Sequence, residues 1–341
     1  MSVTTVSTVM QEAVNNVPRN DIINGGLVVN QENQTAPADD AYTIGDLFLH
    51  VGEGTPVMSL ETTGGPQGDR KWQKMVLDVN SQGGLVYFMS NDDCQDYIAN
   101  GALSFGVQLR TVTGALVSNA RIGILKWTST VDTLTSDVVG TWASDGTDPT
   151  LATNWSYENT PSNLALTNAW QRFTVENVTV DSDTNNIAIF IWTDDGTITA
   201  SDVIGFSEWQ CNPGATVNDF SQPATRDTEH QVWEFYESMT DKVALNDLLC
   251  PGMAVSGTAG EFLYRWRSEK RIAPTVTITS KTLFACEKSN GAAQLCTNLT
   301  STRAGLINVE LAATVSTGLT AGHATFLIIA DPCDVEADAR F

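Results

Sequence analysis

Aromatic and polar side chains that could hold a sugar gather between residues 128 and 169. This stretch is rich in Thr, Ser, Asp and Asn and shows no strong hydrophobic periodicity, which is typical of a functional segment. Aromatic rings offer flat apolar faces, while Asp and Asn accept hydrogen bonds from hydroxyls. We therefore predict a glycan-binding platform at Trp142, Asp145, Asn154, Trp155 and Tyr157. The alternative is that the two Trp are core residues, since most Trp are largely buried.

If these residues form a platform, alanine variants should lose glycan binding without losing stability. Replacing Trp142 or Trp155 by alanine would abolish glycan binding and preserve the melting temperature. A core role would instead lower both together.

Residues for catalysis are poorly supported. The acidic pairs Asp92–Asp93, Asp194–Asp195 and Asp181–Asp183 lie in turn-rich segments, where Asp is favoured for backbone hydrogen bonding. The three His are far apart, and neither a Gly-rich phosphate loop nor a Gly-x-Ser-x-Gly elbow occurs. We expect no enzyme and no cofactor.

A calcium loop is only half present. Residues 181–185 (DSDTN) resemble its start, but no Gly stands at its sixth position and Trp192 replaces the bidentate Glu. A calcium site of another kind stays open.

The six Cys do not form a recognisable metal or disulfide framework. They are spread over the chain without a CxxC pair and are expected to be mostly buried free thiols. Cys286 and Cys296 flank a predicted hairpin tip and are the one pair considered for a disulfide.

Composition excludes several classes of partner. The chain has 341 residues and a net charge of −22, which disfavours binding to a phosphate backbone, so we expect no nucleic acid. We expect no membrane insertion, because no stretch approaches the roughly 18–20 apolar residues that cross a bilayer. Residues 1–20 also lack the features of a signal peptide. A hydrophobic fraction of 42% indicates a folded chain.

The fold class follows from a period of two that begins near residue 21. Leu103, Phe105, Val107 and Leu109 alternate with polar residues, while 85–89 and 187–192 are apolar on both faces and predict central strands. Short strands between Gly-rich turns, without βαβ alternation, predict an all-β protein built on an antiparallel jelly-roll sandwich.

Two helices and four regions complete the predicted organisation. A helix over 228–239 follows from Thr228 and Gln231 as a capping box and from apolar positions at i, i+3, i+4 and i+7. A short N-terminal helix carries an apolar stripe that serves as an oligomer seam or rests on its own domain. The stripe consists of Val3, Val6, Met10, Ala13 and Val17. The predicted regions are 1–19 (helix or seam), 20–225 (jelly roll), 226–250 (helix and connector) and 251–341 (C-terminal β region).

Several segments resemble bacteriophage virion proteins of the tail-fibre or appendage type. These segments are 20–26 (NDIINGG), 42–46 (YTIGD), 124–128 (ILKWT), 151–155 (LATNW), 169–175 (AWQRFTV), 189–192 (IFIW) and 231–237 (QVWEFYE). The Trp-Gln-Arg-hydrophobic strand also recurs in carbohydrate-binding jelly rolls. The resemblance covers most of residues 20–340, supports the fold more than the function, and supplies no catalytic residue.

The resemblance implies a virion structural protein, present in the virion after assembly in the host cytoplasm. We expect a homotrimer that contacts other virion proteins and attaches to host surface glycans, where several weak sites add avidity. The alternatives are a capsid decoration or head fibre with a structural role, and a polysaccharide depolymerase.

Overall fold

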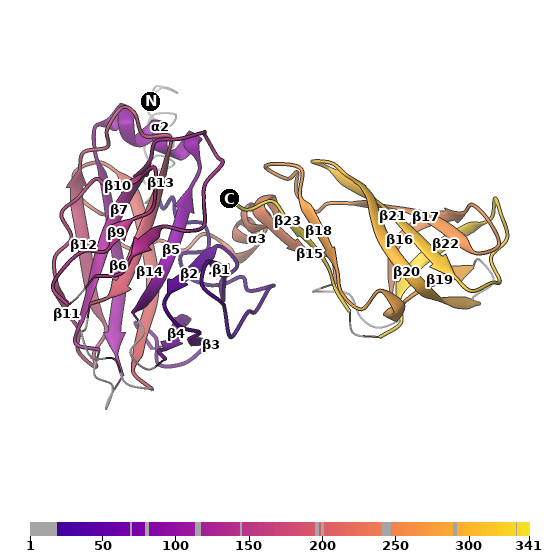
Figure 1. Cartoon of the computed structure of the whole chain (residues 1–341), viewed down its shortest axis with the longest axis horizontal. Helices are drawn as coiled ribbons and strands as arrows, with labels where there is room; N and C mark the ends of the chain where they lie inside the picture. The colour runs from indigo at the N-terminus through magenta and orange to yellow at the C-terminus, as the bar shows by residue number, and fades with distance from the viewer. Residues whose placement is uncertain are drawn as a thin grey trace, which may run out of the picture. The chain divides into compact units, whose positions relative to one another are not determined.

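The computed structural model describes residues 19–68, 70–78, 82–112, 117–143, 145–194, 198, 201–240, 247–288, 292–331 and 333–341 (Figure 1). The chain forms two compact units, one up to Ala224 together with Phe341 and one from Thr225 to Arg340. The predicted seam at Val3, Val6, Met10, Ala13 and Val17 lies outside the described residues. Within the described residues, no helix is long and apolar enough to cross a membrane.

The first unit is a sandwich of two antiparallel sheets (Figure 1). The seven-stranded sheet has the order β1 (Ala41–Tyr42), β2 (Phe48–Gly52), β5 (Gly83–Met89), β13 (Asn186–Thr193), β7 (Asn119–Trp127) and β10 (Trp155–Tyr157), with β11 (Leu164–Ala165) also paired to β7. The five-stranded sheet has the order β12 (Gln171–Val178), β6 (Leu103–Thr111), β14 (Val203–Pro213), β4 (Trp72–Val76) and β3 (Val57–Glu61).

Aromatic side chains fill the space between the two sheets. The fully buried Trp209 on β14 lies 4.9 Å from Phe48 of the facing sheet and 5.8 Å from Phe105 of its own, measured between ring centroids. The apolar residues of β6 face this interior. The predicted all-β sandwich is therefore confirmed.

The seven-stranded sheet is buried on its outer face as well. Phe88, Phe190 and Trp192 point away from the facing sheet and form a second core with residues of the 138–157 segment. This segment contains the small sheet of β8 (Val139–Thr141) and β9 (Thr150–Leu151). Double burial explains why 85–89 and 187–192 are apolar on both faces, and both are central strands as predicted.

One helix of this unit was not predicted. Helix α2 (Asn91–Asn100) begins after Ser90, whose hydroxyl accepts a hydrogen bond from the Asp93 backbone N–H. It ends at Gly101, whose φ of 77° suits glycine.

The second unit begins with α3 (Thr225–Phe235) and corrects the predicted helix over 228–239. The chain turns extended at β15 (Tyr236–Ser238) because the side chains from Tyr236 to Met239 are all buried, which a helix with one apolar face cannot achieve. Thr228 lies inside the helix and is not its N-cap.

The rest of this unit is a three-stranded sheet and a closed barrel (Figure 1). The sheet has the order β15, β23 (Val335–Asp338) and β18 (Thr275–Ile278). The barrel has the order β16 (Leu248–Ala254), β17 (Ala259–Arg265), β21 (Asn308–Val315), β20 (Ala293–Ala304), β19 (Phe284–Lys288) and β22 (Ala324–Ile329), and the short 3-10 turn η1 (Lys281–Leu283) precedes β19.

Candidate functional site

The structure places Trp155 of the predicted platform in the second core of the sandwich. Its side chain is 6% exposed and lies 5.8 Å from Phe88 and 5.0 Å from Trp127 between ring centroids. A sugar cannot stack on a ring whose faces are covered by other rings. The role of Trp155 as a platform is therefore corrected to a packing role, because the 138–157 segment covers the sheet instead of projecting from it.

The other platform residues lie around this core. Trp142 is partly exposed and packs against Phe190 at 6.1 Å, and the Tyr157 hydroxyl donates to the Pro149 carbonyl at 3.0 Å. Asp145 and Asn154 are exposed. Trp155 belongs to the buried core cluster, and Trp142 and Tyr157 are partly buried and pack against it.

The structure also places the residues considered for a calcium site and for a disulfide. The Lys126 ammonium contacts Asp181 at 2.6 Å and Asp183 at 2.9 Å, so a cationic side chain sits against the carboxylates considered for calcium. Among the described residues no group of three or more His, Cys, Asp or Glu is placed to hold a metal. The Cys286 and Cys296 sulfurs lie 3.9 Å apart as free thiols.

The outer face of the five-stranded sheet carries an aromatic group that the sequence analysis did not assign. Trp72 and Trp170 meet edge to face at 5.5 Å, and the Arg110 guanidinium carbon lies 4.3 Å and 4.7 Å from their ring centroids. A Cβ on Gly205 would lie 3.0 Å from Trp72 and 3.1 Å from Trp170. Glycine is therefore needed beneath the two indoles.

Strand register brings these residues together. Arg110 is opposite Gly205, and Gly205 is opposite Lys74 on the next strand, so all three face outward in one row. Trp170 directly precedes β12, and its indole N–H donates to the Gly64 carbonyl at 2.8 Å. That bond holds the ring over the face while leaving it partly exposed.

A buried carboxylate lies beside this aromatic group. Glu208 is the extra residue of a β-bulge in β14, has a φ of 51° and is 2% exposed. Its Oε1 accepts no hydrogen bond from the described residues and lies 3.6 Å from Arg70 Nε. Bulges and left-handed non-glycine residues are costly and concentrate at functional sites.

Burial and the neighbouring polar groups act on the pKa of this carboxyl in opposite directions. Burial raises the pKa of Glu208 above its ordinary value, while Arg70, Arg172 and a hydrogen bond from Gln108 lower it. Burial against the indoles lowers the pKa of Arg110, and Glu61 opposes that effect. The site thus combines acceptors and donors in a partly desolvated setting.

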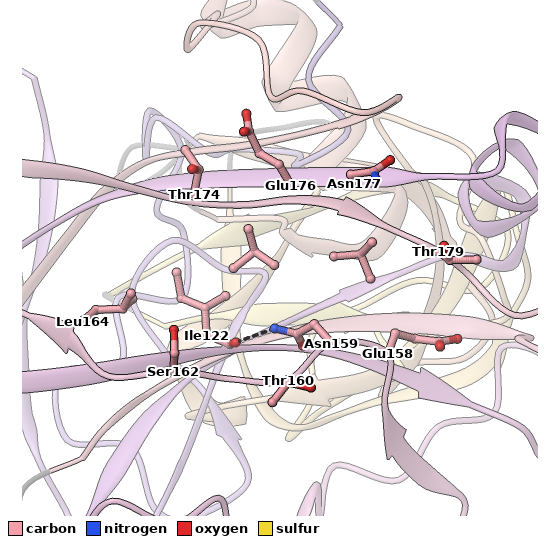
Figure 2. Close-up of a pocket in the computed structure, with 12 residues that line it drawn as sticks. Ile122, Glu158, Asn159, Thr160, Ser162, Leu164, Thr174, Glu176, Asn177 and Thr179 are labelled. Carbon is pink, nitrogen blue, oxygen red and sulfur yellow. Dashed lines mark hydrogen bonds between the residues drawn. The ribbon is translucent and has the colours of Figure 1, made fainter.

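A cavity of about 470 Å³ forms a second candidate at the side of the sandwich, and Figure 2 shows its two walls. One wall includes Glu158 and Asn159, and the other includes Thr174 and Glu176 on β12. Its carboxylates already accept hydrogen bonds, Glu158 from the Thr184 hydroxyl and Glu176 from a backbone N–H. No aromatic ring is among the described residues that line it. The outer face is therefore the better candidate for a sugar.

Part of this site was within reach of the sequence. The alternation over 103–110 already placed Arg110 on the polar face of its strand, and the Trp170–Arg172 motif was recognised only as a resemblance. Trp72 and Glu208 gave no signal, because their positions depend on strand register and on a bulge.

Comparisons with known proteins give similarities among solved structures only. The sequence matches no family model and no curated protein. The similarity to TmCBM61 in complex with β-1,4-galactotriose covers 57% of this chain and 99% of that chain, with 13% identity and a TM-score of 0.32. The similarity to the CBM22-1 xylan-binding domain from Paenibacillus barcinonensis Xyn10C covers 58% of this chain and 99% of that chain, with 11% identity and a TM-score of 0.33.

One structure comes from a phage. The enzymatically active domain of bacteriophage CBA120 tailspike protein 4 is similar to 57% of this chain over 21% of its own, with 10% identity and a TM-score of 0.34. The structures to which this chain is similar therefore include carbohydrate-binding modules and a tailspike domain.

Proposed function

We propose that this protein binds glycans through the outer face of its five-stranded sheet, as a component of a bacteriophage virion appendage. The observation that carries the proposal is the group formed by Trp72, Trp170 and Arg110 beside the buried carboxylate of Glu208. An indole offers an apolar face to the C–H side of a sugar. Amide and guanidinium groups next to it can pair with hydroxyls, and a buried carboxylate can hold them in position.

Polar side chains continue along the outer face of the sheet beyond the indoles of Trp72 and Trp170. Gln108 is opposite Arg172 on β12 and Ser207 on β14 and hydrogen-bonds Glu208. A rigid sheet fixes their spacing better than a loop would. The arrangement therefore suits an extended saccharide, with one ring at Trp170 and its neighbour at Gln108, which the buried Glu208 carboxylate holds in place.

The virion part of the proposal comes from the sequence motifs and the predicted seam. A single shallow face gives weak binding, and a trimer would multiply its retention on a glycan-coated surface. We therefore keep the homotrimer, the contacts with other virion proteins and host attachment within the proposal. A non-catalytic role is part of it too.

A pair of tryptophan variants tests the binding site. Trp170→Ala should weaken binding on an array of bacterial surface polysaccharides at least tenfold, a loss of about 1.4 kcal/mol, because the stacking ring is gone. Trp142→Ala is the matched control, since Trp142 is also partly exposed but belongs to the first predicted platform. Equal binding by Trp170→Ala, or loss only with Trp142→Ala, would move the site away from this face.

The place on the particle is tested separately. Gold-labelled antibody against this protein should mark tail appendages of intact virions in electron micrographs. Label on the head, with binding to empty capsids, would support a capsid decoration protein instead. Release of reducing sugars from a bound polysaccharide would support a depolymerase.

A further inference from the structure

Positive charge is concentrated at the proposed site although the protein is strongly acidic. Residues 1–224 contain eight Lys and Arg against 26 Asp and Glu. Five of the eight lie on the outer face of the five-stranded sheet or in the pocket beside it, namely Arg70, Lys71, Lys74, Arg110 and Arg172. Among the described residues of the five strands, the acidic side chains on this face are Glu61, Glu176 and Glu208. Because salt screens charges beyond about 8 Å, a ligand here meets a locally positive surface.

Arg110 is the cation best prepared for an anion. Within the described residues it has no ion pair, and its buried Nε has no hydrogen-bond acceptor. The indoles of Trp72 and Trp170 hold the guanidinium in one orientation. A positioned, partly desolvated guanidinium favours a carboxylate, which it can bind through two parallel N–H donors.

A pocket beside the outer face adds two more positively charged side chains to the site. It has a volume of about 410 Å³ and is lined by Arg70, Lys71, Gln67 and Gln222 among others. The Arg70 guanidinium also lies 5.4 Å from the Phe220 ring centroid. Two cations and two amides around a pocket of this size offer several donors to an anionic, hydroxyl-rich ligand.

Resting on the proposed function, we infer that the glycan is acidic, a polysaccharide whose sugar carries a carboxylate that binds at Arg110. The sugar ring then lies against Trp170, and a neighbouring residue reaches the pocket at Arg70 and Lys71. A neutral glycan would offer the Arg110 guanidinium only hydroxyl oxygens, which bind it more weakly than a carboxylate does.

The experiment compares each acidic polysaccharide with its own uncharged form. Polygalacturonate, alginate and hyaluronate are titrated into the full chain by calorimetry, each beside its carboxyl-reduced product, at 50 and 300 mM NaCl. We expect at least one acidic form to bind at least tenfold more tightly than its reduced form, with weaker binding at high salt. Because the whole protein is negative, general attraction of polyanions would not produce this result.

Variants of Arg110 locate the effect. Arg110→Gln should lower affinity for that acidic glycan at least tenfold and by a larger factor than it lowers affinity for the reduced form, while Arg110→Lys keeps part of the preference. Arg303→Gln is the control, because it makes the same change in net charge at a highly exposed residue of the second unit. Near-ultraviolet circular dichroism confirms that each variant is folded.

The outcomes separate the two proposals. Equal affinity for acidic and reduced forms, or binding of neutral glycans only, overturns the acidic preference and leaves glycan binding intact. Preference for the acidic form that Arg110→Gln does not change overturns the assignment to Arg110. Binding to neither form of any polysaccharide contradicts both proposals.

Discussion

Asp40 is a carboxyl that the fold holds in an unfavourable place. Its backbone has a φ of 57°, and its Oδ1 is buried without a hydrogen-bond donor among the described residues. Burial, and then the nearby carboxylates of Asp39 and Asp137, raise the pKa of Asp40 to about 6. The folded protein therefore binds this proton more tightly than the unfolded chain does.

The stability of the first unit should depend on pH through this group. Between about pH 4 and 6 the folded state holds more protons, so the free energy of unfolding falls as pH rises through that window. Asp40→Asn removes the effect and keeps a residue that tolerates positive φ.

The melting temperature of Asp40→Asn should equal that of the wild type near pH 4 and exceed it by about 1–2 °C at pH 7, the small size reflecting partial exposure. Thermal melting followed by tryptophan fluorescence at both pH values measures this difference. A variant that is less stable at pH 7 would show that the carboxylate is stabilising.

For individual residues, the sequence predicted which side-chain types could contact a sugar but not which of them are buried. Trp142 and Trp155 stand out in the sequence because they lie in a segment rich in polar residues. The sequence could not show that this segment covers the outer face of a sheet. Arg110 and Trp170 are 60 positions apart in the sequence and meet only through the register of β6 and β12.

Among the elements, strand β14 joins the core to the proposed site. Its bulge turns Trp209 into the interior and Glu208 to the outer face at consecutive positions. Regular alternation after the outward-facing Ser207 would place Glu208 in the interior and Trp209 on the outer face, and the bulge reverses both. The strain at Glu208 is therefore the cost of placing a carboxylate beside Gln108 and Arg70.

Glu208→Gly should separate stability from binding. Glycine adopts positive φ without strain, and the variant no longer buries a carboxylate oxygen that has no hydrogen bond, so we expect unfolding to cost the same or about 1 kcal/mol more. Glycan affinity should fall at least tenfold. Urea denaturation and calorimetric titration measure the two effects.

A second bulge supplies the control for this variant. Asn177 has a φ of 57° at the bulge in β12, is exposed, and is a residue type that tolerates this conformation. Asn177→Gly should change neither stability nor binding appreciably. A strong loss of stability with Glu208→Gly would mean that its carboxylate mainly supports the fold.

Local signals decided which elements the sequence could predict. The strict alternation of 103–110 gave strand β6, and the all-apolar segments gave the central strands β5 and β13. Helix α2 had Ser90 before it and Gly101 after it, a capping pattern that could have revealed it. The end of α3 could not be predicted, because its apolar spacing continues into β15, a strand that is buried on both sides.

In the whole molecule, each unit has a hydrophobic core of its own. Closure of the barrel in the second unit could not be predicted, since it depends on pairing β22 with both β16 and β19. Near the barrel, Lys270 and Glu237 form an ion pair of 2.7 Å and both are fully buried. Glu237 also accepts hydrogen bonds from the Tyr264 hydroxyl and the Arg267 backbone.

Because each unit has its own core, we expect a substitution in one core to destabilise that unit alone. Lys270→Met removes the nearer of the two cations beside the buried Glu237 carboxylate and leaves the Arg267 guanidinium at 3.8 Å, which should lower the free energy of unfolding of the second unit by about 3 kcal/mol. Lys281→Met makes the same substitution at an exposed residue of that unit and should have little effect. Calorimetry of the full chain should show one transition moving to lower temperature while glycan affinity at Trp170 is unchanged. If both transitions moved together, or if affinity fell with them, the two cores would be one cooperative unit, and the binding face would depend on residues far from it in sequence.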